Sequence, residues 1–364
     1  MSLWVVVGGQ YGSEGKGKVS AFITKQENID ICVRCGGPNS GHSLVGQYGK
    51  TVVLRQLPTG FVNPRTRLLI PAGALIDPLV LQQEIDFLKL PPGRIGIDRK
   101  CFIIEEKDRE REEALGLHDR LSSTLCGVGA AQSRRVLRGK DARLARDVSR
   151  EHPWMSQYLT DVSEEVNTAL GNAKKVLIEG TQGFGLSLYH SDHYPKTTSR
   201  DTTAAGFLSE VGVSPLLVTE IVVVFRTFPI RVAGNQAGPL AQEINWEQIQ
   251  RESGYPYPIE ERTSVTNRVR RVSRFDWHLA RRAFAVNRPT RLAVMGFDYL
   301  DHRDYKKTDR AALSVKSVEF VQRFAIEFGG ITYMGTGPGL HDVCDSVLPH
   351  DIVDSDSYTR LSRA

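Results

Sequence analysis

The sequence predicts an α/β fold in which helices cover both faces of a mainly parallel central sheet. Short, continuously apolar runs such as residues 4–7 and 221–225 are typical of strands that are buried on both faces. Amphipathic stretches of helical length lie between these runs, and such alternation is typical of parallel sheets. The loops that carry function are then expected at the carboxyl ends of the strands.

The expected elements follow one another along the chain. Runs rich in Val, Ile and Leu predict buried strands at residues 4–7, 29–33, 51–54, 67–70, 175–178, 221–225 and 291–295. Apolar residues at helical spacing predict helices at residues 15–27, 78–88, 158–172 and 273–286. Residues 106–114 are densely charged, which indicates the solvated face of a helix. No composition shift marks a linker, so residues 1–364 are expected to form a single domain with a peripheral C-terminal segment at 340–364.

Composition excludes several classes of protein. Of 364 residues, 40% are hydrophobic and 24% charged, which is the balance of a globular chain and not of a disordered or fibrous one. No apolar run approaches the roughly 18 residues of a membrane span, and the start lacks the basic region of a signal peptide. The five cysteines are odd in number and scattered, which favours reduced thiols in a cytoplasm. The net charge of +5 suits anionic small molecules and is too small to demand nucleic acid.

The first loop that carries chemistry is Gly8 to Lys18, which follows a strand and opens a helix. Its glycines let backbone N–H groups approach a phosphate, the helix N-terminus adds positive potential, and Lys16 and Lys18 add mobile charges. The segment fits the GxxxxGK part of a P-loop, but Val19 stands where Ser or Thr would hold magnesium. The GxGxxG fingerprint of a dinucleotide-binding fold is missing, which argues against a dehydrogenase.

A second glycine-rich loop, Gly36 to Ser43, ends the next expected strand and contains His42. Together the two loops closely resemble adenylosuccinate synthetase, a family that joins aspartate to C6 of a purine nucleotide at the expense of a nucleoside triphosphate. Later segments match the family in order: Ser123-Thr124, Arg138, Glu179 to Gly183, Thr198, Arg231-Val232, Thr266 to Arg271 and Gly335 to Pro338. The resemblance spans about residues 4–340 and implies a P-loop-related fold, a Mg²⁺ cofactor and a homodimer.

The resemblance also implies the site residues. Those implied to be catalytic are Ser13, Lys16, His42 and Gln182. Those implied to bind the triphosphate are Gly12, Glu14, Gly15, Lys16, Gly17, Lys18, Gly41, His42, Ser43, Arg270, Asp298, Gly335, Gly337 and Pro338. Those implied to bind the purine monophosphate are Ser13, Asn39, Ser123, Thr124, Arg138, Gln182, Thr198, Val232 and Arg268, with Arg138 reaching the partner subunit's site. Thr266, Arg268 and Arg270 are implied to bind L-aspartate, and Ser13 and the Gly41 carbonyl to bind magnesium.

The arginines admit other interpretations. Residues 263–271 suit the capture of a dicarboxylate, because arginine binds carboxylates through two parallel hydrogen bonds, but a solvated basic turn has the same composition. The basic cluster at residues 134–143 lacks the interleaved aromatic residues that base stacking needs, so we expect neither nucleic acid nor a membrane as a partner. A GTPase-like switch or a non-enzymatic nucleotide-binding protein remains the alternative from another class.

Ser13 departs from the family, which has aspartate at this position to accept the N1 proton of hypoxanthine. Serine cannot act as a general base near neutral pH. One consequence is an inactive relative; the other is a changed substrate, because serine leaves room for the 2-amino group of guanine and can accept a hydrogen bond from it. The substitution resembles the bacteriophage branch of the family, which condenses aspartate with dGMP for diaminopurine DNA. We therefore expect dGMP in preference to IMP, and a host cytoplasm if a phage encodes the chain.

The triphosphate donor also departs from the family pattern. The common family binds GTP through a Lys-x-Asp element, whereas here Gly296 replaces the lysine and only Asp298 is kept. Gly335 stands where the family often has serine. Both changes remove contacts to guanine, so ATP or dATP is expected in preference to GTP.

Overall fold

The computed structural model describes residues 2–45, 51–148, 150–263 and 267–345. Within them, ten strands form one central sheet in the order β17, β16, β15, β11, β1, β10, β2, β5, β7 and β9. The strands are β1 (Ser2–Gly8), β2 (Ile31–Arg34), β5 (Arg67–Ile70), β7 (Ile95–Asp98), β9 (Leu159–Thr160), β10 (Lys175–Glu179), β11 (Glu220–Arg226), β15 (Arg291–Met295), β16 (Tyr333–Gly335) and β17 (Val343–Asp345). Neighbouring strands run parallel except β16 and β17, so the predicted mainly parallel sheet is confirmed.

Helices cover both faces of this sheet. They are α1 (Lys16–Gln26), α2 (Pro78–Leu88), α3 (Glu106–Ala114), α4 (Leu117–Leu121), α5 (Val128–Leu137), α6 (Val162–Gly171), α7 (Ala204–Val211), α8 (Trp246–Ser253), α9 (Trp277–Asn287) and α10 (Val315–Phe328). Successive residues of a strand face opposite sides. Accordingly Trp4 and Val6 of β1 pack in the cluster that contains α1, whereas Val5 packs in the cluster that contains α6, α7, α9 and α10.

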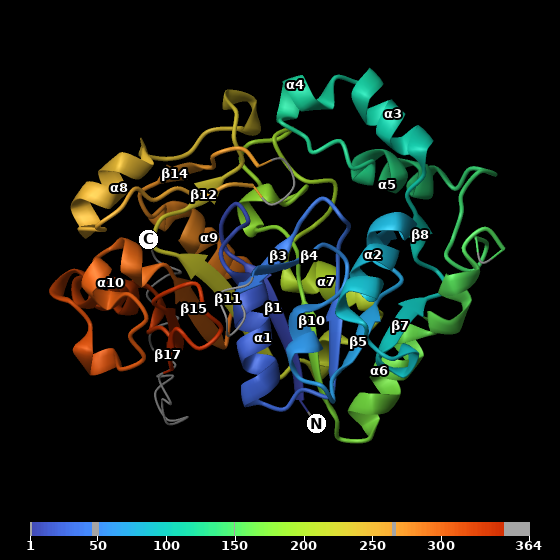
Figure 1. Cartoon of the computed structure of the whole chain (residues 1–364), viewed down its shortest axis with the longest axis horizontal. Helices are drawn as coiled ribbons and strands as arrows, with labels where there is room; N and C mark the ends of the chain where they lie inside the picture. The colour runs from blue at the N-terminus through green and yellow to red at the C-terminus, as the bar shows by residue number, and fades with distance from the viewer. Residues whose placement is uncertain (1, 46–50, 149, 264–266, 346–364) are drawn as a thin grey trace.

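Two groups of elements flank the carboxyl ends of the central strands (Figure 1). One is a three-stranded antiparallel sheet of β12 (Ile230–Arg231), β14 (Arg271–Ser273) and β13 (Glu243–Ile244), with α8 beside it. The other contains α3, α4 and α5, and β6 (Leu75–Ile76) pairs with β8 (Phe102–Ile103) next to it. Both groups contribute residues to the cavity described below.

The expected strand at 51–54 is present but lies outside the central sheet. It is β4 (Thr51–Leu54), which pairs antiparallel with β3 (His42–Val45), and only Leu54 of its four residues is buried. The prediction of a buried strand was therefore wrong, because an apolar run of four residues does not distinguish a core strand from a hairpin. The hairpin matters for function because β3 begins at His42.

Two predicted helices begin later than expected, and a capping aspartate explains each start. Helix α6 begins at Val162, after Asp161 accepts a hydrogen bond from the Glu164 backbone N–H. Helix α9 begins at Trp277, after Asp276 accepts from the Leu279 N–H. Residue 158 instead ends a 3₁₀ turn, and residues 159–160 form β9. Residues 271–273 form β14.

The charged segment at 106–114 forms α3, and most of its residues face solvent as predicted. At the C-terminal end, Val343–Asp345 forms the antiparallel edge strand β17, while 346–364 lies outside the described residues. None of the helices that the structure describes is long and apolar enough to span a bilayer.

Candidate active site

A cavity of about 680 Å³ opens at the carboxyl ends of β1, β2, β11 and β15. It is lined by most of the residues that the sequence singled out: Gly12, Ser13, Glu14, Gly15, Lys16, Gly17, Lys18, Asn39, Gly41, His42, Ser43, Ser123, Thr124, Gln182, Val232, Arg268, Arg270, Asp298, Gly337 and Pro338. Segments far apart in sequence thus meet at one place, as the position of the strand ends predicts.

Among the predicted residues that the structure describes, three do not line the cavity. Gly335 ends β16 and packs against Met295, which does line the cavity. Thr198 is half-buried and donates its backbone N–H to the carbonyl of Leu186, another lining residue. Arg138 is exposed at the end of α5, and Thr266 lies outside the described residues.

The glycine-rich loop after β1 is closed around the carboxylate of Glu14. This carboxylate is fully buried and accepts hydrogen bonds from the backbone N–H groups of Gln10 (3.0 Å) and Gly12 (2.9 Å) and from Lys16 Nζ (2.6 Å). Positive φ angles at Gly12 (85°), Ser13 (61°) and Gly15 (93°) turn the chain there. The Glu14 side chain therefore holds the loop, and a phosphate would meet the backbone of this loop and Lys16.

Lys18 points away from the glycine-rich loop. Its Nζ donates to the carbonyls of Gly337 and Asp342, both at 2.7 Å. Burial lowers the pKa of Lys18 to about 8, although the nearby Asp342 and Asp298 oppose this shift. Lys18 thus joins α1 to the 337–342 loop at one end of the cavity.

His42 lies in a buried cluster with Glu179 and Arg34. Its Nδ1 is 2.5 Å from Glu179 Oε1, and Glu179 also accepts from Arg34 Nη1 (2.7 Å) and from the backbone N–H (2.9 Å) and hydroxyl (2.6 Å) of Thr59. Burial and then the Arg34 charge lower the pKa of His42 to about 3, so the ring is neutral. Burial opposes ionisation of Glu179, but His42 and Arg34 outweigh it and hold its pKa at about 2. The Glu179 carboxylate only accepts, which favours a proton on Nδ1, whereas Arg34 Nη1, which only donates, lies within hydrogen-bonding distance of both ring nitrogens.

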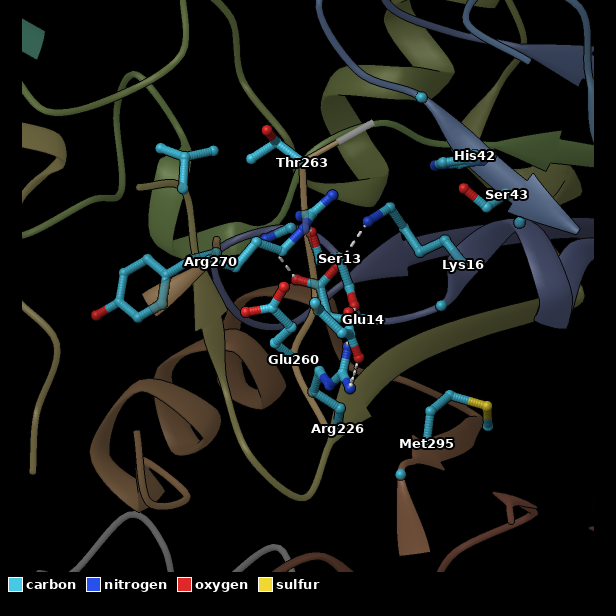
Figure 2. A pocket seen from close by; sticks show the side chains of 18 of the residues that line it. Ser13, Glu14, Lys16, His42, Ser43, Arg226, Glu260, Thr263, Arg270 and Met295 are labelled. Atoms are coloured by element: carbon cyan, nitrogen blue, oxygen red, sulfur yellow. Dashed lines mark hydrogen bonds and ion pairs between the residues drawn. The ribbon is translucent and has the colours of Figure 1, made fainter. Parts of the chain in front are cut away.

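Position 13 contacts two arginines (Figure 2). Arg270 reaches from the 263–271 segment and donates Nη1 to the Ser13 hydroxyl. Arg226, at the end of β11, donates Nη1 to the Ser13 carbonyl at 3.0 Å and both Nη groups to the carboxylate of Glu261. Two guanidinium groups therefore lie against residue 13, and an aspartate at this position would have neutralised part of their charge.

The end of the cavity that lies next to β15 is lined by aromatic side chains and contains Asp298. This aspartate follows β15 in the 3₁₀ turn Phe297–Tyr299 and is 5% exposed. Burial raises the pKa of Asp298 to about 6, against hydrogen bonding from Tyr255. Tyr255, Tyr257, Tyr299 and Tyr305 line the same end.

Several residues in or beside the cavity were not predicted from the sequence: Arg34, Arg226, Tyr255, Glu260, Glu261 and Tyr299. Arg34 and Arg226 were open to prediction, because each is a cation at the carboxyl end of a predicted strand. The others lie in loops without a motif, and only the tertiary contacts bring them to the cavity.

The Ser123–Thr124 segment precedes α5, whose N-terminus is held by Glu112 of α3. The Glu112 carboxylate is buried and accepts from the N–H groups of Gly127 (2.9 Å) and Gly129 (2.7 Å). In the same region Arg134 pairs with Asp108 and Glu105, so part of the basic cluster at 134–143 is neutralised within the fold.

The Gly41 carbonyl and the Ser13 hydroxyl are neutral oxygens, which suits magnesium that arrives already bound to a nucleotide. No group of three or more His, Cys, Asp or Glu side chains placed to hold a metal occurs among the described residues. Magnesium bound mainly through phosphate oxygens needs few protein ligands, and the Gly41 carbonyl and Ser13 hydroxyl at the cavity are of the required chemical type. Arg270 would have to leave the Ser13 hydroxyl first.

One cavity brings together loop amides and a lysine, which bind phosphates, and arginines, which bind carboxylates. This arrangement is typical of a ligase that is driven by a nucleotide. The family model of adenylosuccinate synthetase matches residues 5–151 and 140–308, and this chain belongs to that family of carbon–nitrogen ligases. It is 41% identical over 350 residues to adenylosuccinate synthetase of Thermococcus onnurineus, covering 95% of this chain and 98% of the relative. Identity to the Methanocaldococcus jannaschii synthetase is 41% over 349 residues, covering 94% and 96%.

Two solved structures have the same fold. The succinoaminodeoxyadenylate synthetase (PurZ) of cyanophage S-2L, bound to dGMP and to dATP as an energy donor, superposes with a TM-score of 0.81 at 26% identity over 99% of both chains. The fully ligated adenylosuccinate synthetase of Plasmodium falciparum superposes with a TM-score of 0.80 at 21% identity, over 95% of this chain and 100% of that one.

Proposed function

We propose that this chain joins L-aspartate to C6 of a purine nucleoside monophosphate, driven by a nucleoside triphosphate. The observation that supports this most is that the glycine–lysine loop, His42, Ser13 and Arg270 line one cavity. O6 of the purine attacks the γ-phosphorus as N1 gives its proton to a base, and the bond to the nucleoside diphosphate leaving group breaks. The aspartate amine then attacks C6 and phosphate departs with O6, while the amine loses a proton.

Each group around the cavity has a task in this reaction. Lys16 and the loop amides stabilise the charge on the transferring phosphoryl group, and Mg²⁺ held near the Gly41 carbonyl and Ser13 would neutralise further phosphate charge. A bound triphosphate would raise the pKa of the neutral His42, so that Nε2, which lies 2.9 Å from Arg34 Nη1, turns from this arginine and becomes a donor while Glu179 holds Nδ1. Arg268 and Arg270 bind the carboxylates of aspartate through paired hydrogen bonds.

We propose dGMP as the acceptor, and the argument for this preference rests on Ser13. Serine is smaller than aspartate and uncharged, so it leaves space beside N1 and C2 of the purine, where guanine has its 2-amino group. The cyanophage enzyme with the same fold is bound to dGMP and dATP, which supports the proposal and agrees with an ATP-type donor. The product would be 2-amino-N6-succinyl-2′-deoxyadenylate.

IMP with GTP is the second candidate, and the sequence comparisons favour it. The archaeal relatives at about 40% identity are named adenylosuccinate synthetases, whereas the cyanophage enzyme is only 26% identical. With either acceptor a group other than residue 13 must take the N1 proton, because both purines carry N1–H and a serine hydroxyl is a poor base at neutral pH.

The proposal is tested by phosphate release from purified protein with Mg²⁺, aspartate and ATP, with either dGMP or IMP as the acceptor, and by the product's mass. Aspartate-dependent turnover of dGMP supports the main proposal, and turnover of IMP alone supports the second candidate. Phosphate release without any acceptor would indicate a GTPase-like switch, and binding without release would indicate a non-enzymatic nucleotide-binding protein.

We further propose a homodimer in which Arg138 binds the monophosphate in the partner subunit's site. Arg138 is exposed at the C-terminus of α5, outside its own chain's cavity. Mixing two variants at a monophosphate concentration well below KM, where both are impaired, tests this: His42→Asn keeps Arg138, and Arg138→Leu keeps His42. Mixed dimers then contain one complete site, so activity should return on mixing. If Arg138 acts within its own chain, mixing restores nothing.

A further inference from the structure

Asp298, at the aromatic end of the cavity, has one oxygen engaged within the protein. The hydroxyl of Tyr255 donates to Oδ2 of Asp298 at 2.5 Å, and both residues line the cavity. We propose that Tyr255 determines which base the triphosphate carries, because it occupies one of the two oxygens of Asp298. This inference rests on the proposed function, in which the base of the triphosphate lies at this end.

The two purine bases make different demands on a carboxylate. Guanine presents two neighbouring donors, N1–H and the 2-amino group, which match the two oxygens of a free carboxylate. Adenine presents one amino group, which needs a single oxygen. A guanine edge would have to share Oδ2 with the Tyr255 hydroxyl, whereas an adenine amino group can use Oδ1 alone. The Tyr255 hydroxyl already uses one lone pair of Oδ2 and competes there with the guanine donor, so the pair Tyr255–Asp298 weakens guanine binding more than adenine binding.

Tyr255 is held firmly in place. Its side chain is 7% exposed, and its ring packs against His302 (centroids 4.2 Å apart), Tyr257 (5.5 Å) and Tyr299 (5.9 Å). Burial and then Asp298 raise the pKa of Tyr255, so its hydroxyl stays protonated and remains a donor. Asp298, with a pKa of about 6, is an ionised acceptor above that pH.

Position 296 supports the same preference independently. Gly296 has a φ of 85°, and a Cβ there would lie 3.1 Å from the Thr227 hydroxyl, so a side chain is disfavoured. Position 296 therefore supplies no cation for the O6 acceptor of guanine, and the nearby Lys18 donates to the carbonyls of Gly337 and Asp342.

The test measures equilibrium binding of non-hydrolysable ATP and GTP analogues to the full-length protein by calorimetry, which requires no acceptor. Tyr255→Phe removes the hydroxyl and keeps the ring. We expect the GTP analogue to bind about ten- to a hundredfold more tightly to this variant, the range of one hydrogen bond to a charged group, and the ATP analogue to change less than threefold. Tyr158→Phe, equally buried in a remote cluster, is the matched control.

A second measurement covers the case in which the Tyr255 variant folds poorly. Wild-type protein should bind the ATP analogue at least tenfold more tightly than the matching purine riboside analogue, which lacks the amino group, and Asp298→Ala should abolish this difference. Wild-type protein that binds neither analogue would overturn both this inference and the proposed function. Tight binding with unchanged selectivity in Tyr255→Phe, or equal shifts for both analogues, would overturn this inference alone.

Discussion

The substitution Ser13→Asp should convert the acceptor preference from dGMP to IMP. Ser13 has a φ of 61°, a left-handed conformation that aspartate tolerates better than most residues. Its hydroxyl already accepts from Arg270, so a carboxylate at this position gains a cationic partner at once. The same cation keeps the new carboxylate ionised, as a base for N1 must be.

The expected magnitude follows from two effects. A positioned general base contributes about 10²- to 10⁴-fold to the rate, which sets the gain in turnover of IMP; because guanine also carries N1–H, this base does not by itself discriminate between the two acceptors. The larger side chain also fills the space beside C2, and overpacking costs about 1–3 kcal/mol, so the ratio of kcat/KM for dGMP to kcat/KM for IMP should fall by about tenfold or more.

The assay is steady-state phosphate release with each acceptor at saturating ATP and aspartate. Ser13→Ala is the matched control, because it removes the hydroxyl and supplies no base; IMP turnover should not increase in this variant. If Ser13→Asp leaves IMP turnover at the wild-type level while the protein stays folded, residue 13 neither supplies the base nor selects the substrate, and the argument for dGMP fails.

Three further predictions follow from the site. His42→Asn should lower kcat by about 10²- to 10³-fold, the usual cost of one donor to a developing charge, with the fold retained in circular dichroism; near-wild-type turnover would reject the catalytic role. Arg138→Leu should raise the KM for the monophosphate at least tenfold and change kcat less than threefold, and an unchanged KM would remove the assignment. His42 binds a proton below about pH 3 in the folded protein and near its ordinary 6.5 when unfolded, so the unfolding free energy should fall as pH drops from 6.5 towards 3. Urea unfolding at pH 7.5 and 4.5 measures that loss, which should be smaller in His42→Asn; equal losses would show that His42 titrates normally.

The periodicity of the sequence predicted the long central elements well. Strands β1, β10, β11 and β15 are continuous apolar runs, and such runs are visible without tertiary information. Short edge strands such as β9 and β17 were not predicted, because two or three residues carry too little pattern. The misplaced strand β4 shows the same limit for an apolar run whose partner is a neighbouring hairpin strand.

The residue types in the loops were sufficient to predict phosphate chemistry, since a glycine–lysine loop between a strand and a helix has few other uses. The resemblance to one family extended this prediction to most of the cavity lining. Local sequence does not, however, predict which charged side chains pair with one another. The pairing of Glu14 with Lys16, of Glu179 with His42, and of Arg226 with Glu261 became apparent only in the folded chain.

The sequence determined the fold class, because burial of alternating apolar strands and helices leaves few arrangements. It also determined the kind of ligand, because backbone amides and lysine bind phosphate wherever the chain presents them. The tertiary structure alone decided the state of the site residues: His42 is neutral because burial and Arg34 act on it together, and Asp298 has one oxygen engaged because Tyr255, 43 residues away in sequence, lies against it. Electrostatic and hydrogen-bond interactions depend on distance in space, and only folding sets those distances.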